Sequence, residues 1–135
     1  MMNVLLDTHI ILWALKNDPQ LPAKAKNVID DLGNNIFYST AAIWEIEIKH
    51  NARPDKIKIN GEELSELCRK AGYEMLPIMD GHVKALAGLK RPADAPTHND
   101  PFDKIMLAQA KSEGFSFLTH DSLILQYNEA CVISV

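Results

Sequence analysis

Four acidic residues stand where a carboxylate could do chemistry. Two follow short apolar runs that have the composition of strands, and two lie at polar positions of otherwise apolar helical stretches. They are Asp7, Asp121, Glu45 and Asp103. Carboxylate oxygens are the ligands that Mg²⁺ and Mn²⁺ prefer, and such an ion assists phosphodiester hydrolysis. If the fold brings these residues together, they form a candidate metal centre.

The two aspartates at strand ends have a second, purely structural explanation. Aspartate after a strand often caps the helix that follows, because its carboxylate accepts hydrogen bonds from free backbone N–H groups. Asp7 precedes the helical stretch that begins near Ile10, and Asp121 precedes residues 122–130, which are either helix or loop. For Asp7 the capping and the chemical interpretations stand level.

The stretch 40–52 is a helix with a narrow polar stripe formed by Glu45 and Lys49. Their spacing of four is typical of a surface ion pair. However, apolar residues cover most of the helix circumference, so we expect this helix to be mostly buried. Small Ala41 and Ala42 flank the stripe, which favours a cleft over open solvent.

The stretch HNDPFDKIMLAQA contains two aspartates at the head of one predicted helix, 101–114. Asp100 precedes Pro101, which fits the first helical position, so Asp100 is expected to cap the helix. Asp103 shares a face with Met106 and Leu107, and therefore points inward. Its structural alternative is a capping box with Asp100, for which glutamate reaches back better than aspartate.

The elements that must position these acids alternate along the chain. Short apolar strands are predicted at 3–7, 36–39, 73–78, 115–121 and 131–135, and helices at 10–16, 23–32, 40–52, 62–71, 80–89 and 101–114. This alternation predicts an α/β fold with a central parallel sheet of four to five strands flanked by helices. Ligands bind beyond the carboxyl ends of such strands, where the acids would converge. Clustered carboxylates repel one another, and a divalent cation relieves that repulsion.

Composition sets wider bounds. The 135 residues form one predicted domain, 1–135, with 47% hydrophobic residues and a net charge of −4, which disfavours broad nucleic-acid binding through a basic face. Cys68 and Cys131 have no metal-site spacing and are expected to be reduced thiols. Asp7 and His9 interrupt the apolar N-terminal run, so we expect no membrane segment and a cytoplasmic location.

The stretches VLLDTHIILWAL, STAAIWEIEIK, DPFDKIMLAQA and FLTHD resemble, in this order, PIN-domain ribonucleases, and most closely the VapC-like toxins of bacterial toxin–antitoxin pairs. The resemblance covers nearly the whole chain and implies a PIN-like fold. It also implies a quartet of acids that binds Mg²⁺ or Mn²⁺ and hydrolyses RNA, namely Asp7, Glu45, Asp103 and Asp121. A cognate antitoxin and a homodimer are implied as partners. The chain departs from the family at Lys104, usually arginine, and in a longer spacer before His98.

We hypothesise that Asp7, Asp103 and Asp121 hold the metal and that Glu45 orients a water or completes a second metal position. Residues that could support the site or touch the substrate are Lys49, Thr8, Ser39 and His98. The basic run from Lys49 to Lys58 could guide RNA, although most of it has the character of a solvated helix end. The histidines are predicted to be structural, and Trp13 and Trp44 to lie in the core.

Two other functions remain open from the sequence. A phosphatase with an aspartyl nucleophile also has an apolar strand ending in aspartate, but it needs a second aspartate two residues later, where this chain has His9. A non-catalytic interaction module with the same fold is the other alternative. The presence of all four acids argues against lost chemistry.

Overall fold

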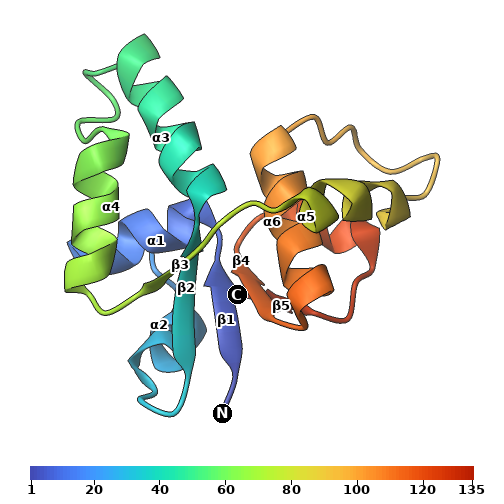
Figure 1. The fold of residues 1–135 in the computed structure, drawn as a ribbon, viewed down its shortest axis with the longest axis horizontal. Helices are drawn as coiled ribbons and strands as arrows, with labels where there is room; N and C mark the ends of the chain where they lie inside the picture. Colours follow the sequence, from blue (N-terminus) through green and yellow to red (C-terminus); the bar gives the residue numbers. More distant parts are fainter.

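A computed structural model describes all residues, 1–135, and contains one five-stranded parallel sheet (Figure 1). The strands are β1 (Asn3–Leu6), β2 (Asn35–Ser39), β3 (Glu74–Leu76), β4 (Ser116–Thr119) and β5 (Val132–Ser134). Their order in the sheet is β3-β2-β1-β4-β5, and every neighbouring pair is parallel. The predicted α/β class and the parallel sheet of four to five strands are therefore confirmed.

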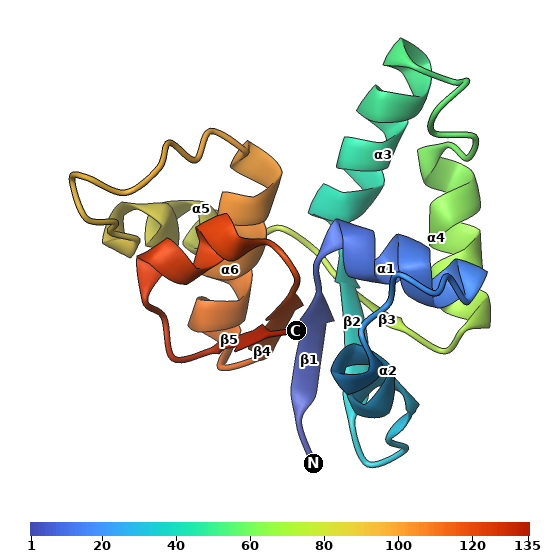
Figure 2. The same ribbon diagram turned by 180° about the vertical axis from the view of Figure 1, so that it is seen from behind.

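Helices cover both faces of the sheet. They are α1 (Thr8–Lys16), α2 (Ala23–Asp30), α3 (Thr40–Ala52), α4 (Gly61–Lys70), α5 (Asp80–Ala85) and α6 (Pro101–Glu113), with 3₁₀ turns η1 (Leu86–Gly88) and η2 (Ser122–Tyr127). Helices α5 and α6 lie over one face (Figure 1), and α1 and α2 lie over the other (Figure 2). None of the helices is both long enough and apolar enough to cross a membrane.

Strand β1 runs through the centre of the sheet and is apolar on both faces. Val4, Leu5 and Leu6 are all fully buried. Central strands of parallel sheets have such continuous apolar sequences because helices cover them on both sides. This burial fixes the position of β1, and therefore also the position of Asp7, which directly follows the strand.

Helix α6 has clear sequence signals at both ends and is buried along most of its length. The Asp100 side chain caps its start by accepting hydrogen bonds from the backbone N–H groups of Phe102 and Asp103, and Pro101 occupies the first helical position. Gly114 ends the helix with φ of 70°, a left-handed conformation that glycine adopts without strain. The predicted cap and start are confirmed, and the predicted end at residue 114 lies one residue beyond the observed one.

Helix α3 is less buried than its apolar composition predicted. Only Ala41, Ala42, Glu45 and Ile46 are buried along it, and the Trp44 side chain is 58% exposed. The prediction that this helix is mostly buried, with Trp44 in the core, is wrong. The reason is that α3 extends away from the end of the sheet and packs mainly against α4 and α6, so much of its surface has no neighbour (Figure 1).

Candidate active site

A cavity of about 300 Å³ lies beyond the carboxyl ends of the strands, and we call it the acidic cavity. It is lined by Asp7, His9, Trp13, Glu45, Asp100, Asp103, His120 and Asp121. All four predicted acids line it. They come from the end of β1, from α3, from the head of α6 and from the segment after β4, which are elements far apart in the sequence.

Asp7 occupies the capping position of α1 but does not cap the helix. Its side chain makes no hydrogen bond to the helix N-terminus and instead accepts one from the Thr119 hydroxyl at 2.6 Å. The capping interpretation of this carboxylate therefore fails. Burial raises the pKa of Asp7, while the hydrogen bond from Thr119 acts in the opposite direction.

Thr119 joins two of the four acids. Its buried hydroxyl donates to Asp7 and accepts the backbone N–H of Asp121 at 3.0 Å. Asp121 also caps η2, because one of its carboxylate oxygens accepts the N–H of Leu123 at 2.9 Å. This role of Thr119 could not be predicted from the sequence, because the contact joins residues 112 positions apart.

Glu45 is a buried carboxylate whose two oxygens each have a partner. The side chain is buried to 2% exposure, Oε1 accepts the Thr8 hydroxyl at 2.6 Å, and Oε2 forms an ion pair with Lys49. Burial lowers the pKa of Lys49, but the hydrogen bond to Glu45 and its charge outweigh burial, and the pKa is raised. The pair is thus not a surface ion pair, since its acidic end lies inside the protein.

Asp103 is 7% exposed, and its carboxylate makes no capping-box hydrogen bond to the backbone N–H of Asp100. Burial raises its pKa to about 9, and the charges of Asp7, Asp100 and Asp121 add to the effect. Desolvation and repulsion by the neighbouring carboxylates therefore disfavour the ionised form of Asp103. A bound cation would offset both effects.

The surroundings of His98 were the least well predicted from the sequence. It is 3% exposed, its Nε2 lies 3.5 Å from the Asp103 carboxylate, and its Nδ1 lies 2.8 Å from the Tyr127 hydroxyl. One ligand atom each from His98, Asp103 and Asp121 lie within 4.8 Å of one another. Burial lowers the pKa of His98, which favours the neutral imidazole that binds metals.

The donors fit a divalent cation. His98, Asp103 and Asp121 form the tightest group, and Asp7 lines the same cavity. Carboxylate oxygens with a single imidazole suit a hard or intermediate divalent ion. A cation would also offset the carboxylate repulsion that raises the pKa of Asp103.

Other sequence-based expectations meet mixed outcomes. Thr8 contacts Glu45 as a supporting residue should, but Ser39 caps α3 and donates to Gln109 instead of reaching the acids. In the basic run, Arg53 pairs with Asp55, which agrees with a solvated helix end. His9 and His120, predicted to be structural, line the rim of the acidic cavity together with partly buried Trp13.

Comparisons with known proteins agree with the fold described above. The family model for the PIN domain matches residues 4–129. VapBC2 from Rickettsia felis bound to a promoter DNA fragment has a TM-score of 0.67 at 14% identity, over 99% of this chain and 98% of that one. A toxin–antitoxin complex from Klebsiella pneumoniae has a TM-score of 0.63 at 14% identity, with 97% and 96% covered. DNA-bound VapBC from Salmonella typhimurium has a TM-score of 0.62 at 17% identity, with 99% and 98% covered.

None of the curated proteins matches the sequence. The identities to the solved structures are low, and these likenesses therefore establish the fold alone. The family model, in contrast, spans nearly the whole chain, from β1 to the end of η2. The chain therefore belongs to the PIN domain family.

Proposed function

We propose that this protein is a divalent-metal-dependent endoribonuclease and the toxin of a toxin–antitoxin pair. The observation that carries the proposal is the convergence of four carboxylates from four separate elements in one cavity of about 300 Å³. Among these four acids, Glu45 pairs with Lys49, and Asp103 contacts His98 at salt-bridge distance. Asp7 and Asp121 have no basic side chain at that distance. They are left for a cation.

In this proposal Asp7, Asp103 and Asp121 hold Mg²⁺ or Mn²⁺, directly or through water, and His98 lies close enough to join them. The ion supplies charge neutralisation at the phosphate and a bound water of lowered pKa. Glu45, fixed by Thr8 and Lys49, orients a water next to the metal position. Thr119 keeps Asp7 and Asp121 in register with each other.

The proposed partners rest on different support. RNA as the substrate rests on the resemblance of the acidic quartet to PIN-domain ribonucleases. An antitoxin partner is supported by the fold neighbours, two of them VapBC proteins and one a toxin–antitoxin complex. A homodimer is proposed because exposed Trp44 and Ile48 give α3 an apolar surface that another chain could cover.

Expression of the protein in bacteria tests both halves of the proposal. Wild-type protein should arrest growth, and sequencing of RNA 5′ ends should show new cuts that appear with induction. Asp7→Asn keeps the size of the side chain but removes its charge, so it should abolish both the arrest and the cuts.

The matched control is Asp30→Asn, which removes an exposed aspartate that pairs with Lys26 on the surface of α2. This variant should arrest growth and cut RNA as the wild type does. Arrest that survives Asp7→Asn would contradict metal-dependent hydrolysis. Absence of any cuts by the wild type would instead favour the non-catalytic interaction module.

A further inference from the structure

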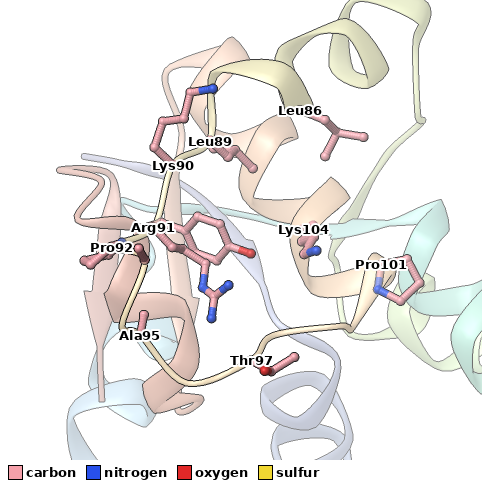
Figure 3. A pocket seen from close by; sticks show the side chains of 11 residues that line it. Leu86, Leu89, Lys90, Arg91, Pro92, Ala95, Thr97, Pro101 and Lys104 are labelled. Atoms are coloured by element: carbon pink, nitrogen blue, oxygen red, sulfur yellow. The ribbon is translucent and has the colours of Figure 1, made fainter.

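A second and larger cavity lies beside the acidic one, under the loop that leads into α6 (Figure 3). It has a volume of about 670 Å³ and is called the basic cavity here. The lining side chains that matter are the basic Lys90, Arg91 and Lys104, the apolar Leu86 and Leu89, and Tyr127. No acidic side chain lines it, whereas the acidic cavity contains five carboxylates. Two neighbouring hollows of the same surface thus differ completely in charge.

Arg91 is the most unusual residue of the basic cavity. Its Nε and one terminal nitrogen, Nη2, are buried and have no hydrogen-bond partner. The guanidinium carbon lies 5.7 Å from the centre of the Tyr127 ring, which holds the group in place from one side. Figure 3 shows the guanidinium reaching into the space between the loop and the head of α6. Buried donors without partners are costly. Because Nε and Nη2 are buried, an anion in the cavity reaches them only if the guanidinium turns towards it, and that turn would supply their missing hydrogen bonds.

The other two cations of this cavity are also free of protein partners. Neither Lys90 nor Lys104 is in an ion pair, and Arg91 is not either. In contrast, Lys49 and Arg53 of the basic run from Lys49 to Lys58 are both paired with carboxylates. The positive charge of the basic cavity is therefore available to a ligand.

The two cavities are joined by a short chain of contacts. Arg91 lies against the Tyr127 ring, the Tyr127 hydroxyl lies 2.8 Å from His98, and His98 lies 3.5 Å from Asp103. The head of α6 also faces both, since Asp100 and Asp103 line the acidic cavity and Lys104 lines the basic one. A ligand that extends across the head of α6 would reach both cavities.

We propose that the basic cavity binds one phosphodiester group of the RNA strand. Along the strand, this group is a neighbour of the phosphodiester that lies over the acidic cavity. The inference rests on the proposed function and names a second contact for the same substrate. The planar guanidinium of Arg91 matches two phosphate oxygens, Lys104 adds charge, and the apolar wall at Leu86 and Leu89 accommodates the sugar or base. The volume is within the range of pockets that take small organic groups of this size.

RNA is favoured over an acidic peptide because the basic cavity lies next to the acidic one. The proposed function places a phosphodiester at the neighbouring acidic cavity, and the next phosphates of the same strand then lie alongside the basic cavity. Since the whole chain carries a net charge of −4, an RNA strand needs local cations close to the scissile group, and Lys90, Arg91 and Lys104 are such cations.

The test measures RNA binding without hydrolysis. A fluorescein-labelled single-stranded RNA of mixed sequence is titrated at several NaCl concentrations in Ca²⁺, an oxygen-binding cation that offsets the charge of the acidic cavity, and a gel of the same samples shows that the RNA stays intact. The anisotropy gives the affinity and the salt dependence. Arg91→Gln should weaken binding several-fold and reduce the slope of log K against log salt by about 0.7, the value for one phosphate contact to a single strand. Arg91→Lys should keep the slope and lose part of the affinity, because it keeps the charge without the planar fork.

Arg69→Gln is the matched control, since Arg69 is exposed on α4 and pairs with Glu66. It should bind RNA as the wild type does. Circular dichroism and the thermal midpoint show whether each variant is folded. If Arg91→Gln does not fold, Lys104→Gln provides the same test and should also reduce the slope.

Unchanged affinity and slope in folded Arg91→Gln would overturn the proposal, as would a wild type that binds no RNA at low salt. So would a labelled hexaglutamate peptide whose binding depends on Arg91 while RNA binding does not. Because hydrolysis is absent, the result is independent of the proposed activity. RNA binding that depends on Arg91 in a protein that cuts no RNA would refute the nuclease function and keep this inference.

Discussion

The two aspartates at the head of α6 have different roles although they are three residues apart. Asp100 satisfies the N–H groups of Phe102 and Asp103, while Asp103 lies within 3.5 Å of His98 and makes no capping hydrogen bond. The helical phase separated them in the sequence, because Asp103 falls on the inward face with Met106 and Leu107. Local rules of this kind work when the interaction stays within one element.

Substitutions at the two positions should have opposite effects. Asp100→Ala should lower the free energy of unfolding by about 1 kcal/mol, as the loss of a helix cap usually does, and should keep much of the activity. Asp103→Ala should abolish activity and leave the fold intact. Denaturant unfolding and RNA cleavage assays measure the two effects. Equal loss of activity in both variants would show that the assignment of separate roles is wrong.

The raised pKa of Asp103 predicts how stability depends on pH. The folded protein binds the proton with a pKa of about 9, against an ordinary value of 3.8, so the carboxyl stabilises the fold most below pH 3.8 and loses this contribution as the pH rises towards 9. Asp103→Asn is neutral at every pH. In EDTA its thermal midpoint should exceed that of the wild type by a margin that grows from about pH 4 to about pH 9.

A margin between Asp103→Asn and wild type that stays constant over this range would contradict the prediction. The matched control is Asp30→Asn. Its carboxylate is exposed and paired with Lys26, and the variant should show no growing margin. Thermal scans monitored by circular dichroism suffice for all three proteins.

At the scale of elements, the loop from Lys90 to Asp100 depends on a tertiary anchor. His98 is the buried residue of this segment, and its Nδ1 contact to the Tyr127 hydroxyl ties the loop to the end of η2. The same imidazole faces Asp103. The contact between His98 and Tyr127 thus fixes the position of the loop. The loop in turn forms the boundary between the acidic and basic cavities.

Tyr127→Phe tests this anchor, because it removes the hydroxyl and keeps the ring. We expect a loss of about 1 kcal/mol in the free energy of unfolding, typical of one hydrogen bond. Amide hydrogen exchange in the loop should become faster, and the affinity for Mn²⁺ should fall because His98 is no longer held. Tyr73→Phe serves as a control, because Tyr73 directly precedes β3, whereas Tyr127 ends η2, which packs against β5 at the opposite edge of the sheet. Exchange rates that are identical in Tyr127→Phe and wild type would contradict an anchoring role.

The elements show what the sequence could and could not establish. Alternating apolar strands and helices predicted the parallel sheet, and Asp100 and Pro101 predicted the start of α6, because these signals are local. The burial of α3 was predicted wrongly, since composition does not show where neighbours are missing. The contacts of His98 and Thr119 were not predicted, because they join segments that only the folded chain brings together.

At the scale of the whole molecule, the fold collects negative charge at one end of its sheet and keeps basic groups beside it. Asp7, Glu45, Asp103 and Asp121 come from separate elements, so the complete chain must fold before the acidic cavity exists. A cation that binds there therefore binds only the folded state. Metal affinity and folding stability are linked through this dependence.

Divalent cations should accordingly stabilise the protein. Mn²⁺ or Mg²⁺ at about 100 times its dissociation constant should add about 2.7 kcal/mol to the free energy of unfolding, and EDTA should remove this gain. Thermal scans at rising metal concentration measure the effect. Asp7→Asn and Asp103→Asn should show a much smaller gain than Asp30→Asn. A gain of equal size in all of these variants would place the metal elsewhere.

The most direct test of the central claim is RNA hydrolysis by the purified protein. Wild type and Asp30→Asn should cut a mixed cellular RNA in Mg²⁺ or Mn²⁺ and should stop in EDTA. The cleavage rate of Asp103→Asn should fall by more than roughly 100-fold. Substitution of a residue that only supports a metal ligand typically costs about 10- to 100-fold, and a ligand itself should cost more. A cleavage rate that is unchanged by EDTA, or by Asp103→Asn, would contradict the assignment of the four acids as a metal-dependent nuclease site.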